Sequence, residues 1–288
     1  MPLSRIQLNQ GSPVPASSTA TGTAGQVSYD SQYQYICVST NYWVRTPLTP
    51  WLSITTRPRL WLNAANTLSL FDVTTGCNNT ANGGFVKRWE DVSGNGLHFT
   101  NDTSPPTLAT NSANGLPVVV FSRASNQYLQ CTTLAVTGSA NRTVFVAGMA
   151  TGTTSNSFYF ALSNNVTDVG GAWGIANDLS LRHTGGRFSV FGSGQSDVFN
   201  IVSAMQNGTT SSDTSMWRNG VSLTASSRAN VGAINTTGTA MTLAAVDGPA
   251  AVNITSCSIG EVIVYASALT SSERAAVESY LINKWGIT

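Results

Sequence analysis

The glutamates are candidate catalytic residues for the hydrolysis of a glycosidic bond. That reaction needs two carboxylates that face one cleft. One glutamate falls in a turn, one stands alone in an apolar run and two fall in a helical pattern: Glu90, Glu261, Glu273 and Glu278. No two of them have the spacing that puts both carboxylates on one face of a strand. We therefore expect no enzymatic activity.

The histidines and cysteines show no catalytic or metal-binding pattern. His98 and His183 lie in unrelated strings, without a G-x-S-x-G sequence or a reactive-cysteine signature near them. The cysteines have neither C-x-x-C nor metal-ligand spacing: Cys37, Cys77, Cys131 and Cys257. We expect isolated buried thiols, and a disulfide such as Cys77–Cys131 is the alternative.

A tryptophan between glycines is the first candidate for ligand binding. Trp173 lies in the string GGAWG at 170–174, where small neighbours let a sugar ring approach closely. Asn177 and Asp178 follow it and supply an amide and a carboxylate that can bind hydroxyl groups. The alternative, which we favour, is a core tryptophan that faces an opposite sheet.

A turn at 89–96, WEDVSGNG, is the candidate for a metal ion. Asp91 and Asn95 carry the oxygen ligands that calcium prefers. Asp and Asn next to glycine are also ordinary turn-forming residues, and we favour this alternative. No other cofactor is expected.

The composition excludes several classes of partner. Only 9% of the residues are charged, against roughly 25% in an ordinary soluble domain, and the net charge is +1. The arginines are scattered, so we expect no nucleic acid partner. No apolar run is long enough to span a membrane, and the start MPLSRIQLNQ lacks the apolar stretch of a signal peptide. We expect synthesis in a cytoplasm.

Three segments differ in composition. Residues 1–24 are rich in Pro, Ser, Thr and Ala without periodicity, which predicts an extended arm that lacks its own core. The arm has four apolar side chains that we expect to contact an assembly partner: Leu3, Ile6, Leu8 and Val14. Residues 25–57 contain three short runs, at 26–29, 33–38 and 42–45, that predict a small β unit for docking. Residues 58–288 form the third segment.

The third segment predicts an all-β domain. Apolar runs recur between Gly, Asn, Ser and Asp, at 118–121, 143–149, 158–162, 172–175, 188–191, 199–205, 215–217, 221–223, 241–245 and 259–265. Such spacing is typical of an antiparallel sandwich or barrel. Asn219-Gly220 between two runs predicts a hairpin. A capping box from Thr270 to Glu273 predicts one helix near 271–284, with Val277, Leu281 and Trp285 on its buried side.

Three strings in this segment resemble one known family. They are LWLNA at 60–64 with WEDVSGNG at 89–96, NGLPVVVF at 114–121, and IGEVIVY at 259–265 with KWGI at 284–287. They resemble the concanavalin A-like lectin/glucanase jelly rolls, in particular laminin-G-like domains. The resemblance implies two packed antiparallel sheets with a C-terminal helix. Family members often carry Asp where this chain has Asn63, and the glucanases use an E-x-D-x-x-E pair that this chain lacks.

The N-terminal unit resembles a short module of bacteriophage tail fibres, on the strings GTAG at 22–25, YICV at 35–38 and WVR at 43–45. An extended arm, a tail-fibre-like module and a lectin-like sandwich follow one another along the chain. This order resembles that of phage structural proteins and implies a non-enzymatic structural protein on the exterior of a phage virion. The sandwich would then serve host-surface glycan adhesion, in a tail fibre or as a capsid decoration. Residues 1–57 would dock to other virion proteins, as a homo-oligomer for which we take a trimer. A bacterial glycan-binding surface lectin and a glycoside hydrolase are the alternatives.

Overall fold

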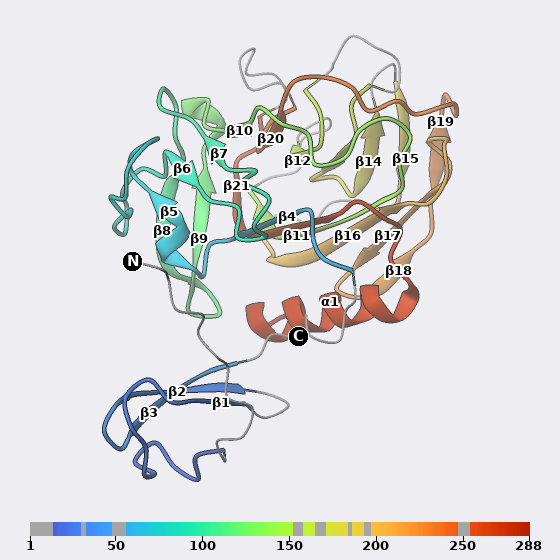
Figure 1. The fold of residues 1–288 in the computed structure, drawn as a ribbon. Helices are drawn as coiled ribbons and strands as arrows, with labels where there is room; N and C mark the ends of the chain where they lie inside the picture. The colour runs from blue at the N-terminus through green and yellow to red at the C-terminus, as the bar shows by residue number, and fades with distance from the viewer. Residues whose placement is uncertain are drawn as a thin grey trace, which may run out of the picture. The chain divides into compact units, whose positions relative to one another are not determined.

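The computed structural model describes residues 14–29, 33–47, 56–151, 158–164, 171–183, 186–192, 197–246 and 254–288. The chain divides into two compact units, Met1–Thr55 and Thr56–Thr288 (Figure 1). The described residues contain 21 strands, and every strand pairing among them is antiparallel. No helix in this part of the chain is long and apolar enough to cross a membrane.

The first unit contains one sheet of three strands, β1 (Val27–Tyr29), β2 (Tyr33–Ser39) and β3 (Tyr42–Pro47), in the order β1-β2-β3. Asn41, with a φ of 57°, allows the tight turn from β2 to β3. The indole of Trp43 is buried on one face of this sheet.

The segment before β1 covers Trp43, so from Ser17 onward the predicted arm belongs to the first unit. Trp43 donates from its backbone N to Ser18 O at 2.8 Å and from Nε1 to Ala20 O at 3.0 Å. Gly22 lies against the indole, where a Cβ would come within 2.6 Å of Cζ2. Val14 is exposed. Three other predicted contact residues lie outside the described residues: Leu3, Ile6 and Leu8.

The second unit is a sandwich of two sheets. The ten-stranded sheet has the order β19-β15-β14-β13-β12-β20-β10-β7-β6-β5. Its strands are β5 (Leu70–Phe71), β6 (Arg88–Trp89), β7 (Phe99–Thr100), β10 (Leu129–Cys131), β12 (Phe158–Ala161), β13 (Gly174–Ala176), β14 (Ser180–His183), β15 (Arg187–Val190), β19 (Ser227–Ala229) and β20 (Met241–Leu243).

The eight-stranded sheet has the order β18-β17-β16-β11-β21-β9-β8, with β4 paired to β21 beside this path. Its strands are β4 (Leu60–Asn63), β8 (Thr107–Ala113), β9 (Leu116–Phe121), β11 (Arg142–Ala150), β16 (Asn200–Gln206), β17 (Thr214–Arg218), β18 (Val221–Leu223) and β21 (Cys257–Tyr265). Two short 3₁₀ helices, η2 (Thr67–Ser69) and η3 (Arg123–Ser125), lie in the connections.

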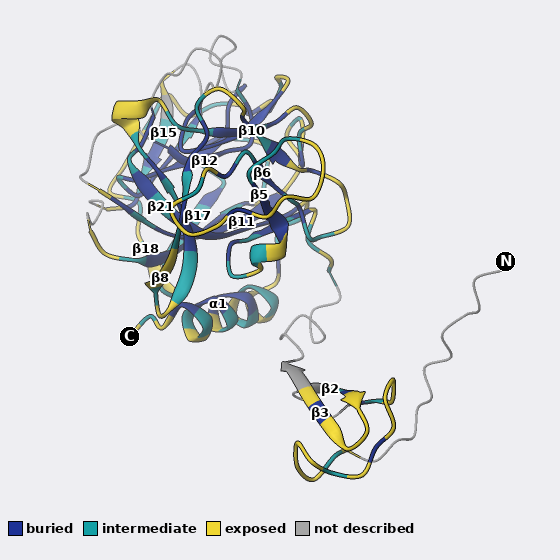
Figure 2. Ribbon diagram, turned by 90° about the vertical axis from the view of Figure 1, so that its left-hand side faces the viewer, coloured by how far each residue is buried: buried dark blue, intermediate teal, exposed yellow. Residues whose placement is uncertain are grey.

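The two sheets enclose one main apolar core, which runs along the chain from Leu60 to Val264. Figure 2 shows buried residues along the central strands and exposed residues in many of the connections. The predicted all-β, two-sheet antiparallel sandwich is therefore confirmed. The Asn219-Gly220 hairpin is also present, since Arg218 pairs with Val221 across it.

The predicted C-terminal helix is confirmed as α1 (Ser271–Trp285), with a complete capping box at Thr270 and a left-handed Gly286 at its end. It packs on the outer face of the eight-stranded sheet, beside β11 and β16 (Figure 1). Val277, Leu281 and Trp285 are buried as expected, and Trp285 stacks on Phe199 with ring centroids 5.3 Å apart. Glu278 is buried too, which the pattern of apolar residues did not predict.

The shortest strands of the ten-stranded sheet were not predicted from the sequence. Strands β5, β6 and β7 contain two residues each, too few to form a recognisable apolar run. Their pairing depends on neighbours that lie far away in the sequence, such as Gln130 of β10 opposite Thr100 of β7.

We predict that residues 56–288, produced alone, fold to the same sandwich. Its main core starts at Leu60 and contains no residue of the first unit. The thermal midpoint of this shortened chain should match the sandwich transition of the full chain, as measured by circular dichroism. A loss of more than about 2–4 °C, which corresponds to about 1 kcal/mol at this size, would show that the first unit stabilises the sandwich.

Candidate functional site

A β-bulge in β21 brings a glycine and a glutamate side by side beneath α1. Glu261 pairs with Ala147 and Ile259 with Gly148, so that Gly260 is the extra residue. Gly260 lies against the Trp285 indole, where a Cβ would come within 2.4 Å of Cη2. The indole can reach the sheet only because this position has no side chain.

The carboxylate of Glu261 is completely buried and accepts four hydrogen bonds. The donors are Trp61 Nε1 at 2.6 Å, Tyr280 Oη at 3.1 Å, Lys284 Nζ at 2.7 Å and Trp285 Nε1 at 3.0 Å. We call these five residues, together with Asn63, the Glu261 cluster. A buried charge is tolerated when an opposite charge and hydrogen bonds compensate it, and here all of its donors come from β4 and α1.

Lys284 completes the cluster from the other side. Its Nζ donates to Asn63 Oδ1 at 2.8 Å and to Tyr280 Oη at 3.0 Å. Burial lowers the pKa of Lys284, and the opposing charge of Glu261 offsets part of that effect. Burial also raises the pKa of Tyr280, with Glu261 acting in the same direction. This cluster was not predicted from the sequence, although a glutamate inside an apolar strand is the signal of a buried, paired charge.

Glu278 forms a second buried contact between α1 and the sheet. Its carboxylate accepts from Ser203 Oγ on β16 and from Arg274 Nη1, one helical turn earlier. The guanidinium of Arg274 lies 4.1 Å from the ring centroid of Trp217. Both buried glutamates therefore fasten the helix to the sheet and face no open cleft.

Trp173 lies in the core between the sheets. Its side chain is completely buried, and the guanidinium of Arg142 lies 5.9 Å from its ring centroid. Arg142 is also buried and donates to Thr236 Oγ1 at 2.6 Å and to the carbonyls of Gly138 and Ala140. Burial lowers the pKa of Arg142 to about 10. The structure thus gives Trp173 the core position that we favoured, and no exposed face on which a sugar could stack.

The two residues predicted to assist Trp173 differ in their exposure. Asn177 is buried, and Asp178 is half-buried. The carboxylate of Asp178 accepts from the backbone N and the hydroxyl of Ser180 and pairs with Arg182. Asp178 is thus engaged in contacts within its own segment, while a role of Asn177 and Asp178 in glycan binding stays a prediction.

The predicted calcium ligands hold a turn together. Asp91 is buried and accepts from the backbone N of Trp61, Ser93 and Leu97 at 2.9, 2.9 and 3.1 Å, and from Ser93 Oγ at 2.8 Å. Asn95 accepts from Arg59 Nη1 at 3.0 Å and donates to Arg59 O at 3.1 Å. In the part of the chain that the structure describes, no three His, Cys, Asp or Glu side chains are grouped to hold a metal ion.

All four cysteines are free thiols. Cys37, Cys131 and Cys257 are buried, as the sequence analysis expected, whereas Cys77 is exposed. Burial raises the pKa of Cys257 and Cys131, so neither is a reactive thiolate at neutral pH. The alternative Cys77–Cys131 disulfide is absent.

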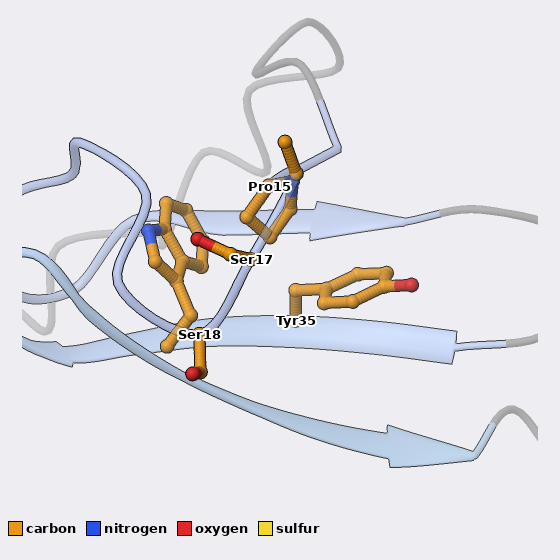
Figure 3. Close-up of a pocket in the computed structure, with 6 residues that line it drawn as sticks. Pro15, Ser17, Ser18 and Tyr35 are labelled. Atoms are coloured by element: carbon orange, nitrogen blue, oxygen red, sulfur yellow. The ribbon is translucent and has the colours of Figure 1, made fainter.

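An open cleft of about 470 Å³ lies in the first unit, on the Trp43 side of its sheet. Residues 15–18 form one wall, and Tyr35 and Trp43 form the other. Figure 3 shows Pro15, Ser17 and Ser18 on the segment that crosses the sheet, with the Tyr35 ring beside them. The walls thus present a proline, aromatic rings and hydroxyl groups to the opening. We call this the Tyr35 cleft.

A second groove, of about 430 Å³, lies where the β17–β18 hairpin meets the end of α1. Its lining residues are Arg218, Asn219, Val221, Leu223, Ile282, Ile287 and Thr288. None of these is aromatic, and the Asn219 side chain is occupied by Ile201 N and Asn200 Oδ1. The Tyr35 cleft is therefore the better candidate for binding among the described residues.

We predict that Trp173→Ala destabilises the sandwich by about 3–5 kcal/mol, because it leaves a large cavity in the core. Denaturant unfolding measures the loss. The control is Val221→Ala, at a position that is 67% exposed, which should cost less than about 0.5 kcal/mol. Weakened glycan binding with unchanged stability in Trp173→Ala would instead support a sugar-stacking role.

We predict that Asp91→Ala costs about 2–3 kcal/mol, because it leaves the buried N–H groups of Trp61 and Leu97 without their acceptor. Asp102→Ala is the matched control, since its exposed pair with Lys87 should contribute less than about 1 kcal/mol. Thermal unfolding with calcium and with a chelator should give the same midpoint. A rise in the midpoint with calcium that Asp91→Ala abolishes would establish a metal site here.

No protein-family model and no curated protein matches the sequence. Solved structures do match the fold. An arabinofuranosidase, complexed with arabinofuranosyl-α-1,2-xylobiose, is similar with a TM-score of 0.53 and 12% identity over 82% of this chain and 64% of that one. The binding domain of Paraclostridial Mosquitocidal Protein 1 is similar with a TM-score of 0.51 and 13% identity over 70% of this chain and 51% of that one.

Identities this low establish the fold alone. This chain spans about half the length of the toxin binding domain and less than two thirds of the arabinofuranosidase. The second unit accordingly shares its two-sheet β-sandwich fold with these structures.

Proposed function

We propose that the protein is a non-enzymatic structural protein of a bacteriophage virion, displayed on the exterior of the particle. In this proposal residues 1–55 attach it to other virion proteins, and the lectin-like sandwich faces outward for adhesion to host-surface glycans. The chain is made in the host cytoplasm and acts either in a tail fibre or as a capsid decoration.

The proposal that the protein binds glycans and does not hydrolyse them rests on the contacts that all four glutamate side chains make. Glu261 of β21 and Glu278 of α1 are both buried between the helix and the sheet, where a substrate cannot reach them. Glu273 closes the capping box with Thr270. Glu90 pairs with Arg88 at 3.1 Å. The glucanases of this fold use two glutamates that face one open cleft, whereas these four glutamates make structural contacts.

The first unit supports a role in attachment. A sheet of three short strands buries too little surface to be stable alone, so it needs a neighbour or further copies of itself. The Tyr35 cleft is open and combines proline, aromatic and hydroxyl groups, which suits an extended segment of another virion protein. A homo-oligomer, which we take to be a trimer, would supply the additional strands.

The lectin-like fold supports adhesion by the sandwich. The similar structures include the binding domain of a mosquitocidal toxin and a carbohydrate-active enzyme in complex with its sugar. With only 9% charged residues, the chain recognises its partners mainly through hydroxyl and amide groups, as suits a neutral glycan. A bacterial glycan-binding surface lectin is the alternative, and a glycoside hydrolase is the weaker one.

We predict that Tyr35→Ala lowers incorporation of the protein into particles at least tenfold, because it removes one wall of the cleft. Phage lacking the protein are complemented with each variant, and purified particles are analysed by immunoblot. Tyr42→Ala is the matched control, since Tyr42 is a tyrosine of the same sheet, 51% exposed and outside the cleft. Equal incorporation of both variants would refute attachment through the Tyr35 cleft, and the absence of the wild-type protein from particles would refute the virion role.

A further inference from the structure

Three groups of the Glu261 cluster are arranged for a covalent reaction. Lys284 Nζ lies 2.8 Å from Asn63 Oδ1 and 2.7 Å from Glu261 Oε2. We propose that Lys284 and Asn63 join in an intramolecular isopeptide bond, with Glu261 carrying the proton. This inference goes beyond the proposed function and does not depend on it.

The amine is close to the carbon it would attack. Because Oδ1 is about 1.2 Å from Cγ of Asn63, a 2.8 Å contact to Oδ1 places Nζ within about 4 Å of Cγ. Reacting atoms in a near-attack arrangement are about 3–3.5 Å apart, so a small shift of the Lys284 side chain suffices. The lowered pKa of Lys284 increases the share of neutral amine, which is the nucleophilic form.

The amide of Asn63 is held as an electrophile. Its Oδ1 accepts from two donors, Lys284 Nζ and the backbone N of Ala65 at 3.0 Å. Both donors need an acceptor, so the amide atom that faces them is Oδ1 and the leaving nitrogen Nδ2 points away from them. The N–H of Ala65 would also stabilise the negative charge that develops on Oδ1 when Cγ becomes tetrahedral.

Glu261 is placed to move the protons. Its carboxylate first takes a proton from the Lys284 ammonium, and the neutral amine attacks Cγ of Asn63. The Nζ–Cγ bond forms, Glu261 transfers a proton to Nδ2, and the Cγ–Nδ2 bond breaks. The attacking Nζ loses its extra proton to the departing ammonia, which leaves as ammonium, and Glu261 is again a carboxylate. Nothing is oxidised or reduced, and no further reactant is needed.

The surroundings favour this chemistry over hydrolysis. The Lys284 side chain is only 16% exposed, and the Trp61 and Trp285 side chains both donate to Glu261. Such an enclosure limits the water that would otherwise compete for the amide. The bond would join the first strand of the sandwich, β4, to its last helix, across 221 positions of sequence.

Mass spectrometry of the full-length, denatured wild-type protein tests the proposal. The intact mass should be lower than that of the sequence by one molecule of ammonia. Lysine occurs at two positions only, Lys87 and Lys284. Trypsin should therefore release a single cross-linked species in which residues 60–87 are joined to residues 275–288, with no cleavage after Lys284.

Three variants make the result specific. Lys284→Arg keeps a positive charge without a nucleophilic amine and should restore the full mass, whereas Lys87→Arg should leave the bond intact. Glu261→Gln should abolish or greatly slow the mass loss in protein that circular dichroism shows to be folded. Loss of ammonia that persists in Lys284→Arg would indicate succinimide formation at an Asn-Gly sequence. That outcome, or folded wild-type protein with the full mass and two separate peptides, would overturn the proposal.

Discussion

A single buried charge determines how the last part of the chain packs. Glu261 lies on β21, the strand that pairs with β4, β9 and β11 in the eight-stranded sheet. Its carboxylate has lost its water and must be compensated within the protein, because an isolated buried charge costs several kcal/mol. The compensation comes from Lys284, Tyr280 and Trp285 of α1 and from Trp61 of β4. Helix and first strand are thereby held to the same point of the sheet.

Other charged residues of the sandwich are also paired inside the fold. The chain has few charged residues, and many of those it has are used inside the fold: Glu278 with Arg274, Asp91 beneath the Trp61 strand, and Arg142 with backbone carbonyls. With so few charged residues, contacts made by this chain depend on hydrogen bonds and apolar packing more than on charge.

Several features could be predicted from sequence because they are local. The Asn219-Gly220 hairpin follows from residues that tolerate a positive φ, and α1 follows from a capping box and an apolar spacing of four. The apolar runs predicted most of the longer strands. The two-residue strands β5, β6 and β7 could not be found this way, since their only support is the neighbouring strand.

The all-β architecture and the C-terminal helix could be predicted from the sequence, because both follow from residue type and short spacing. Three further features could be seen only in the folded chain: the burial of Trp173, the four hydrogen bonds to the Asp91 carboxylate, and the contacts of Lys284 with both Asn63 and Glu261. These outcomes depend on which distant segments pack together. Asn63 and Lys284 are 221 positions apart, and the bulge at Gly260 that makes room for Trp285 is visible only once β11 and β21 are paired.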